Sequence, residues 1–296
     1  MLITGIIGYP LRNTLSPILH NAAYTYAKLQ GVYLNLPVKP VFLRDTLDRV
    51  RTKNFRGVNV TSPYKESILE HVDATNRDVQ RLGATNTIIV EDGQLHAYNT
   101  DAYGFTRSLQ DHHIIIKNRR VLLIGTGGAS RACASVVAAQ KPRACYIASR
   151  DHAKAKKLSA LFNVEALDPD LMTAAFMTGI DVVINATTID LYRNISPLMA
   201  SPSTYYDLNY CFRSRARTGI TAVNGLSMLV HQAARSFFLW TGIKVPVDVL
   251  KVNAGLPVPN HANRGGDQAL INDLRTTCHS FKKAVSSAGI IKARKC

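Results

Sequence analysis

Two short polar segments carry side chains that could perform acid–base chemistry. Residues 59–66 (Asn-Val-Thr-Ser-Pro-Tyr-Lys-Glu) include Lys65, and residues 99–101 (Asn-Thr-Asp) end in Asp101. A lysine ammonium beside a carbonyl oxygen stabilises the negative charge that develops there and delivers a proton, and in the reverse reaction a lysine accepts one. A lone lysine is usually a solvated surface charge, so the prediction of a catalytic pair depends on the neighbouring motifs.

A glycine-rich turn at residues 125–129 (Gly-Thr-Gly-Gly-Ala) follows these segments. It lies between an apolar strand pattern at 121–124 and a helix pattern at 130–140, and a second strand pattern follows at 145–148. In this setting small residues let backbone N–H groups and the helix N-terminus approach a pyrophosphate. A strict G-x-G-x-x-G spacing would place glycine where this chain has Ser130. The order of strand, turn, helix and strand nevertheless predicts a dinucleotide site.

The residues after the second strand bear on the choice of dinucleotide. Hydroxyl and arginine side chains accommodate a ribose 2′-phosphate at this point, whereas an acidic residue binds a 2′-hydroxyl. Ser149 and Arg150 therefore favour NADP, and Asp151 favours NAD. Because a helix pattern starts at residue 152, Asp151 also fits the role of an N-cap. We expect NADP, with NAD as the alternative.

Short β-rich patterns, separated by helical patterns, must position these groups. They occur at residues 4–8, 32–36, 57–60, 121–124, 145–148, 181–185 and 205–210. This alternation predicts an α/β protein in which an N-terminal α/β domain is followed by a domain with a parallel sheet flanked by helices. A long helical pattern then follows Gly225 and runs to about Thr241.

Composition bounds the class of protein. The 296 residues are 46% hydrophobic and 19% charged, which is ordinary for a globular chain long enough for two domains. No stretch of about 18 apolar residues is free of charge, and the N-terminus has no basic region before its apolar residues. We therefore expect a cytoplasmic protein without a membrane partner. Five scattered cysteines without a Cys-x-x-Cys pair favour reduced thiols, and no metal site is predicted.

The net charge of +16 favours anionic ligands, such as a dinucleotide phosphate or a carboxylate substrate. It also permits nonspecific association with nucleic acid, which we do not expect to be a functional partner. Part of the charge lies in a basic tail from Arg264 onward, where apolar residues between Leu270 and Val285 recur at helical spacing. We expect a monomer or a homodimer.

The motifs occur together in a defined order. They are Thr-Leu-Ser-Pro at 14–17, the segment 59–66, Gly-Ala-Thr-Asn-Thr at 83–87, the segment 99–101, the glycine turn, and Asn-Gly-Leu-Ser-Met at 224–228 followed by Gln232. With this combination the chain resembles the shikimate dehydrogenases over about residues 4–251. The resemblance implies a substrate domain, a Rossmann-type cofactor domain and a last helix that returns to the substrate domain. It further implies an enzyme of aromatic amino acid biosynthesis that reduces 3-dehydroshikimate to shikimate with NADPH.

The resemblance also implies domain limits and residue roles. Residues 1–102, completed by C-terminal helices within 225–296, would form the substrate-binding catalytic domain, and residues 103–224 the dinucleotide-binding domain. Lys65 and Asp101 would be the catalytic pair. The substrate would be held by polar side chains, namely Thr14, Ser16, Asn59, Thr61, Asn86, Tyr210 and Gln232. The cofactor would be held by Gly125, Gly127, Gly128, Ala129, Ser149 and Arg150, with Met228 near the nicotinamide.

Several candidates also have a purely structural interpretation. Residues 14–17 could be a helix N-cap with proline in the first turn, and Asn86 could be a turn residue. Gln232 could be a solvated or backbone-bonded helix amide, and Tyr210 a strand residue whose ring packs.

The chain departs from the usual family pattern in places. Thr14 adds a methyl group where serine is usual, Asp190 lies where small residues are usual near the nicotinamide, and Asn224 replaces an aspartate. A quinate or aminoshikimate dehydrogenase that uses NAD therefore remains an alternative. A catalytically silent dinucleotide-binding protein is another, and it would not need Lys65 together with Asp101.

Overall fold

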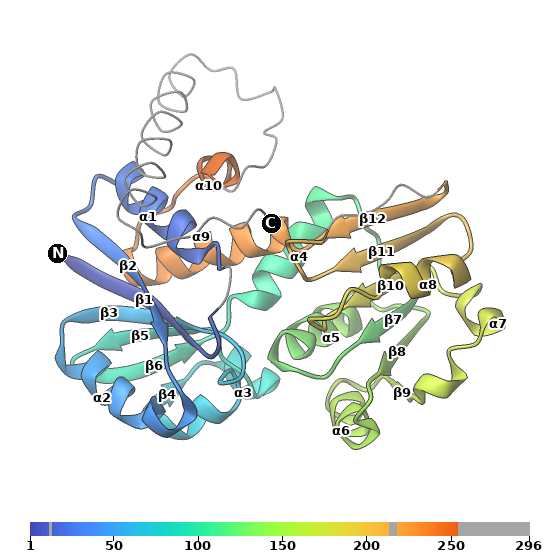
Figure 1. The fold of residues 1–296 in the computed structure, drawn as a ribbon, viewed down its shortest axis with the longest axis horizontal. Coiled ribbons are helices and arrows are strands. Elements are labelled where there is room, and N and C mark those ends of the chain that lie inside the picture. The colour runs from blue at the N-terminus through green and yellow to red at the C-terminus, as the bar shows by residue number, and fades with distance from the viewer. Residues whose placement is uncertain (12–13, 213–217, 254–296) are drawn as a thin grey trace, which may run out of the picture.

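The computed structural model describes residues 1–11, 14–212 and 218–253, which form two β-sheets side by side (Figure 1). The first sheet has the strand order β2-β1-β3-β5-β6-β4. Its strands are β1 (Leu2–Gly8), β2 (Gly31–Pro37), β3 (Phe55–Val60), β4 (Ala74–Thr75), β5 (Thr87–Glu91) and β6 (Gln94–Tyr98). Strands β2 and β3 run parallel to β1, whereas β5 is antiparallel to β3 and β6, so the sheet is mixed.

Helices cover both faces of this sheet and form with it what we call the first lobe. The consecutive residues Ile6 and Ile7 of β1 belong to different cores, because neighbouring strand residues point to opposite faces. On one face lie α1 (Ser16–Tyr26), α9 (Leu226–Thr241) and α10 (Val247–Asn253), and on the other lies α2 (Leu43–Thr52). The short helices η1 (Pro40–Phe42), η2 (Ser67–His71) and α3 (Arg77–Leu82) complete the lobe. Helix α9 is anchored by Trp240, whose Nε1 donates to the carbonyl of Ile88 at 2.9 Å.

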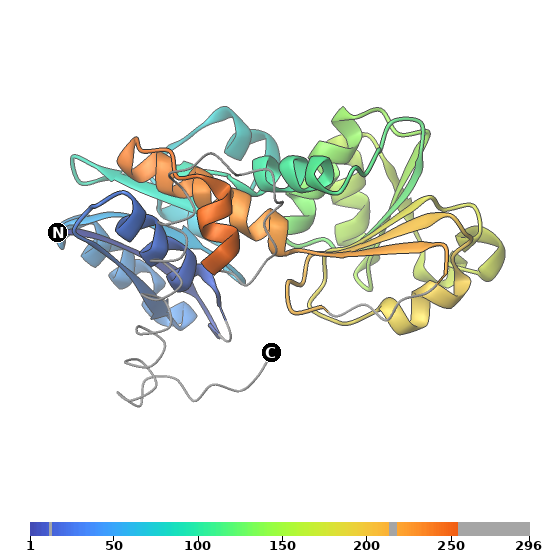
Figure 2. The ribbon, with the colours of Figure 1, turned by 90° about the horizontal axis from the view of Figure 1, so that it is seen from above.

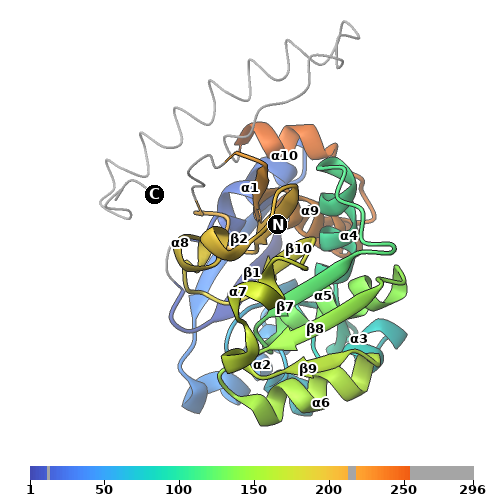
Figure 3. The same cartoon turned by 90° about the vertical axis from the view of Figure 1, so that its right-hand side faces the viewer.

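The second sheet and its helices form the second lobe, which faces the viewer in Figure 3. All its strands are parallel, in the order β12-β11-β10-β7-β8-β9. The strands are β7 (Arg120–Ile124), β8 (Ala144–Ala148), β9 (Glu165–Leu167), β10 (Val182–Asn185), β11 (Ser203–Asp207) and β12 (Ile220–Asn224). The surrounding helices are α5 (Gly128–Ala139), α6 (His152–Phe162), η3 (Pro169–Leu171), α7 (Ala174–Met177), α8 (Tyr192–Ile195) and η4 (Ser196–Leu198). Cores on both faces bury the sheet, as a parallel sheet requires.

Two helices connect the lobes, α4 (Asp101–Asp111) and α9, and they lie alongside one another (Figure 2). Their ends are joined at Asp111, whose Oδ2 accepts from Ser227 Oγ at 2.7 Å, His231 Nε2 at 2.9 Å and Lys251 Nζ at 3.0 Å. Burial opposes ionisation of Asp111, but these donors outweigh it and hold the pKa of the carboxyl at about 2. The carboxylate therefore ties α4, α9 and α10 together at neutral pH.

The α/β fold predicted from the sequence is confirmed, with one correction at strand β11. The predicted strand continued to residue 210, but β11 ends at Asp207. Asp207 Oδ1 accepts from the backbone N–H of Asn209, and Asn209 Oδ1 accepts from that of Cys211, so successive Asx turns replace the strand. No helix in the described part of the chain is long and apolar enough to cross a membrane. The tail helix predicted between Leu270 and Val285 lies outside the described residues.

Candidate active site

Two cavities meet between the lobes. The smaller has a volume of about 290 Å³ and reaches into the first lobe, and the larger, of about 570 Å³, runs along the glycine turn of the second lobe. Both are lined by Thr61, Ser62, Lys65 and Ala129. A molecule in one cavity would therefore touch a molecule in the other beside Lys65.

The pairing of three strands brings the polar segments to this place. In the first sheet Asn59 of β3 lies opposite Thr87 of β5, and Thr87 lies opposite Tyr98 of β6. The segment after β3, the segment before β5 and the segment after β6 therefore leave the sheet at the same edge. They carry Lys65, Asn86 and Asp101 respectively.

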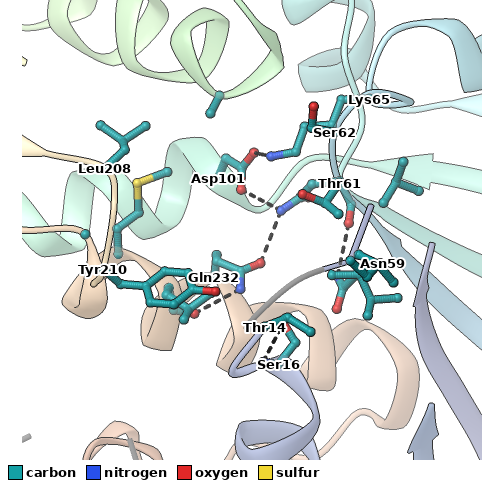
Figure 4. A pocket seen from close by; sticks show the side chains of 18 of the residues that line it. Thr14, Ser16, Asn59, Thr61, Ser62, Lys65, Asp101, Leu208, Tyr210 and Gln232 are labelled. Carbon is teal, nitrogen blue, oxygen red and sulfur yellow. Dashed lines mark hydrogen bonds and ion pairs between the residues drawn. The ribbon is translucent and has the colours of Figure 1, made fainter. Parts of the chain in front are cut away.

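Lys65, in the wall shared by the cavities, forms an ion pair with Asp101, which lines the smaller cavity (Figure 4). Lys65 Nζ lies 2.5 Å from Asp101 Oδ2, and the two side chains are only 16% and 7% exposed. Asp101 is the first residue of α4, where the helix dipole favours a carboxylate. Its backbone N–H donates to Asn99 Oδ1 at 3.0 Å, which fixes the start of the helix. The ammonium and the carboxylate therefore have one defined orientation toward the smaller cavity.

Asn86 and Gln232 extend this polar wall. Asn86 Nδ2 donates to Asp101 Oδ1 at 2.7 Å and to Gln232 Oε1 at 3.2 Å, while its Oδ1 accepts from the backbone N–H of Thr100 at 2.7 Å. Gln232 Nε2 donates to the carbonyl of Leu229 at 2.9 Å. Gln232 is thus a buried amide bonded both to its own helix and to Asn86, so the interpretation as a solvated amide is wrong and the interpretation as a backbone-bonded amide is confirmed.

Asn59 supports the polar wall through hydrogen bonds of its side-chain amide. Its Nδ2 lies within hydrogen-bonding distance of the carbonyl of Asn86 at 3.0 Å and of Thr87 Oγ1 and Ser236 Oγ, both at 3.1 Å. Its Oδ1 accepts from the hydroxyl of Tyr33 at 2.8 Å. Most of the hydrogen-bonding capacity of Asn59 is therefore used to join strands β3 and β5 to helix α9.

The side of the smaller cavity opposite the Lys65–Asp101 pair is lined by Thr14, Ser16 and Tyr210, whereas Thr61 lies on the same side as Lys65 (Figure 4). Thr14 Oγ1 accepts from the backbone N–H of Ser16 at 3.2 Å, but the N-cap position of α1 is occupied by Leu15, which makes no side-chain cap. Tyr210 reaches the cavity because the turns after β11 redirect the chain. Hydroxyl groups therefore face the Lys65–Asp101 pair across the cavity.

The glycine turn fits a dinucleotide. Helix α5 begins at Gly128, and its N-cap residue, Gly127, makes no side-chain cap, so the first-turn N–H groups have no such partner. A Cβ atom built on Gly127 would meet no atom within 4 Å, because that position faces the open cavity. Gly125 has φ +114, which glycine adopts readily, and a Cβ atom built there would lie 3.2 Å from the carbonyl oxygen of Ala186. The turn therefore leaves space for a pyrophosphate to approach the backbone.

Ser149 and Arg150 line the larger cavity, whereas Asp151 does not. Asp151 Oδ1 caps helix α6 by accepting from the backbone N–H of Lys154 at 3.0 Å, and its Oδ2 lies 3.2 Å from Lys154 Nζ. The N-cap interpretation of Asp151 is therefore confirmed. Asp190 is likewise absent from the cavity lining, because its Oδ1 accepts from the backbone N–H of Tyr192.

Met228 is buried and lines the smaller cavity, together with Ala129, Leu208 and Leu229. These side chains form an apolar surface next to the polar wall. Within the described residues, no cluster of three histidine, cysteine, aspartate or glutamate side chains could hold a metal ion.

Some residues of the site were not singled out from the sequence. Thr100 and Ser236 complete the buried network, with their hydroxyl oxygens 3.1 Å apart. Ser236 lies one helical turn after Gln232, so helical spacing is the signal that could have identified it. No such signal in the sequence points to Arg131, which contacts the first lobe.

Replacing Gly127 by alanine tests the dinucleotide assignment. Its backbone angles, φ −76 and ψ 179, suit alanine, so the protein is expected to fold and melt as the wild type does. The new methyl group would occupy the space of a phosphate, and losing a hydrogen bond to a charged group costs about 1.5–3 kcal/mol, so we expect roughly 10- to 100-fold weaker NADP⁺ binding. Calorimetric titration measures this, and an unchanged dissociation constant would place the dinucleotide elsewhere.

Three models of known protein families match parts of this chain. Residues 6–88 match the family model of the shikimate dehydrogenase substrate binding domain, residues 108–194 that of shikimate / quinate 5-dehydrogenase, and residues 225–251 that of the shikimate 5′-dehydrogenase C-terminal domain. The NADP⁺-dependent shikimate dehydrogenase of Halothermothrix orenii is 36% identical over 266 residues, which are 82% of this chain and 91% of that protein.

Solved structures give the same result. Shikimate 5-dehydrogenase of Thermus thermophilus, in complex with NADP(H) and shikimate, is 31% identical with a TM-score of 0.77, over 86% of this chain and 99% of that one. The ligand-free 5-ketofructose reductase of a Gluconobacter species is also similar, at 27% identity and a TM-score of 0.71, over 86% of this chain and 98% of that one. The identity and coverage shared with the Halothermothrix enzyme, together with the three matched family models, show that this chain belongs to the shikimate dehydrogenase family.

Proposed function

We propose that this chain is an NADP-dependent oxidoreductase that reversibly reduces 3-dehydroshikimate to shikimate. The observation that carries the proposal is the position of the Lys65–Asp101 pair, in which Lys65 lies in the wall shared by the two cavities. A reaction that transfers hydride between two bound molecules needs this contact between their sites.

The smaller cavity suits a small carboxylate with several hydroxyl groups. Hydroxyls of Thr14, Ser16, Thr61 and Tyr210 and amides of Asn86 and Gln232 line it, so donors and acceptors would surround the ligand with one ammonium and one carboxylate among them. We assign the carboxylate of the substrate to the side of Thr14 and Ser16, and its reacting oxygen to the side of Lys65. Asn59 also lines this cavity, and we propose that it contributes to holding the substrate.

Lys65 and Asp101 would perform the proton transfer. Bound NADPH would supply the hydride. Lys65 Nζ, next to the reacting carbonyl oxygen, would stabilise the negative charge that develops there and deliver a proton to it. In the direction of oxidation Lys65 would receive the proton from the hydroxyl. Asp101 orients the ammonium and is itself held by Asn86, so the proton donor keeps one position.

The choice of NADP is supported by the charge of the ribose-binding turn. The carboxylate of Asp151 is used as the cap of α6 and paired with Lys154, so it leaves the positive charge of Arg150 beside the larger cavity. An arginine that is not neutralised favours a 2′-phosphate. Gly125, Gly127, Gly128 and Ala129 would hold the pyrophosphate, and Met228 would contact the nicotinamide.

We further propose that residues 1–102, completed by helices from residue 225 onward, are the substrate-binding domain, and that residues 103–224 are the dinucleotide domain. Two observations support this division: strands β1–β6 form one sheet and β7–β12 the other, and α9 packs against the first sheet. We also propose that the protein is cytoplasmic, acts as a monomer or homodimer, and has no nucleic acid partner.

Steady-state assays that cross shikimate, quinate and aminoshikimate with NADP⁺ and NAD⁺ test the function. We expect the highest kcat/KM for shikimate with NADP⁺. Higher kcat/KM for quinate or aminoshikimate, or for NAD⁺, would correct the substrate or the cofactor. Absence of turnover with every combination, despite NADP⁺ binding in calorimetry, would instead indicate a silent dinucleotide-binding protein.

A further inference from the structure

Arg131 reaches out of its own lobe. It lies near the start of α5, three residues after Gly128, and its guanidinium contacts two segments of the first lobe. Its Nη2 lies 2.7 Å from Glu66 Oε2, and its Nη1 donates to the carbonyl of Leu82 at 3.2 Å. Glu66 is the residue after Lys65, and Leu82 is the last residue of α3, four residues before Asn86.

The same helix also contacts Lys65 directly. A Cβ atom built on Gly128 would lie 2.7 Å from Cβ and 2.9 Å from Cδ of Lys65, so the backbone of the glycine turn packs against the lysine stem. On the other side, the backbone N–H of Thr85 donates to the carbonyl of Lys65 at 2.8 Å. The start of α5, the Lys65 turn and the segment before Asn86 are therefore joined at several points.

The ion pair of Arg131 and Glu66 also lies where its charges would act on a bound dinucleotide. Glu66 lines the larger cavity, where a bare carboxylate would repel a phosphate. Arg131 neutralises it and uses two nitrogens in the fixed geometry of a guanidinium. Because the Glu66 side chain is 45% exposed, the ion pair contributes little to folding stability. Its role is instead to fix the position of α5 relative to the first lobe.

We propose that Arg131 is a positioning residue for the proposed reaction, bridging Glu66 and Leu82 so that the glycine turn stays at a fixed distance from Lys65. The proposal rests on the function given above. It assigns to Arg131 no contact with substrate or cofactor, and its effect acts through the placement of Lys65.

Arg131→Met, Glu66→Gln and the double variant test the bridge. A misplacement of about 1 Å can cost roughly 100-fold in rate, so each single variant is expected to lower kcat by roughly 10- to 100-fold with little change in the KM for shikimate. The double variant should be no slower than the slower single variant, because the two side chains act as one unit. Arg131→Lys, which keeps the charge but has one donor nitrogen in place of two, should restore part of kcat.

Backbone hydrogen exchange gives a readout that needs no turnover. Without the bridge, the peptide covering residues 82–86 should exchange faster in Arg131→Met than in the wild type. Arg119→Met is the matched control, because Arg119 pairs with Asp181 at 3.4 Å within the second lobe and should leave both kcat and this exchange unchanged.

Wild-type kcat in both Arg131→Met and Glu66→Gln would overturn the proposal. Additive losses in the double variant together with unchanged exchange at residues 82–86 would also overturn it, since the two residues would then act separately. If the wild type itself failed to oxidise shikimate, the proposed function would fall, and the exchange comparison would still decide whether Arg131 holds this segment.

Discussion

Replacement of Lys65 by alanine is expected to lower kcat for shikimate oxidation by roughly 100- to 10,000-fold, the range that a positioned acid–base group contributes. The expectation follows from the place of the ammonium, 2.5 Å from Asp101 Oδ2 and in the wall common to both cavities. The KM for shikimate should change much less, because in the proposed assignment the ring would be held mainly by the other hydroxyl and amide groups that line the smaller cavity.

Two controls make this prediction specific. Lys53→Ala removes an exposed lysine of the same lobe and should leave kcat unchanged. Calorimetric titration with NADP⁺ should give Lys65→Ala a dissociation constant close to that of the wild type, which would show that the cofactor site is intact. Added ethylamine should restore part of the rate, because a small amine can occupy the space of the missing ammonium. An undiminished kcat in Lys65→Ala would reject the assigned role.

Much of this site could be predicted because local chemistry specifies it. Residues 121–148 specify strand, glycine turn, helix and strand through short-range patterns, and the structure forms these elements with α5 starting at Gly128. Asp151 was recognised as an N-cap for the same reason, since a cap needs only the residue and the helix that follows. The ordered motifs indicated the family, and the resemblance to that family indicated the candidate residues of both cavities.

The spatial relations were harder to predict because they depend on contacts between distant residues. Lys65 meets Asp101 only because β3, β5 and β6 pair in one particular register, and residue patterns alone do not fix that pairing. The turn at residues 208–210 replaces only the end of the predicted strand, because two side chains accept backbone N–H groups, which a hydrophobic pattern does not reveal. The bridge from Arg131 to Glu66 joins two lobes, so no pattern of neighbouring residues in the sequence predicts it.

His20 is expected to make the first lobe lose stability in mild acid. Burial lowers its pKa from 6.5 to about 3, and the nearby Asn59 amide opposes this shift only in part. Neither ring nitrogen of His20 has a hydrogen-bond partner of ordinary geometry among the described residues. The ring stacks on Tyr33, with centroids 4.3 Å apart and an interplanar angle of 5°. The folded protein therefore holds a neutral imidazole that the unfolded chain protonates below pH 6.5.

The sign and size follow from proton linkage. Below pH 6.5 the unfolded state binds a proton at His20 that the folded state does not, so the free energy of unfolding falls as the pH falls. At pH 4.5, which is above the folded pKa of about 3, the loss from His20 is about 3 kcal/mol relative to neutral pH. Because other groups titrate as well, the prediction concerns the difference between the wild type and a variant without this imidazole.

Urea unfolding of His20→Phe and His20→Leu at pH 7 and pH 4.5 measures the difference. Fluorescence can follow the first lobe specifically, because Trp240 is the single tryptophan of the chain and its ring centroid lies 5.1 Å from that of His20. Whatever their stability at pH 7, both variants should lose about 3 kcal/mol less than the wild type on acidification. The control variant is His113→Asn, at an exposed position where φ is 53, a value that asparagine tolerates. Its free energy of unfolding should fall on acidification as much as that of the wild type. Equal losses in the wild type and the His20 variants would mean that the imidazole is protonated in the folded protein, and that the stacked, unpaired ring is not the source of acid sensitivity.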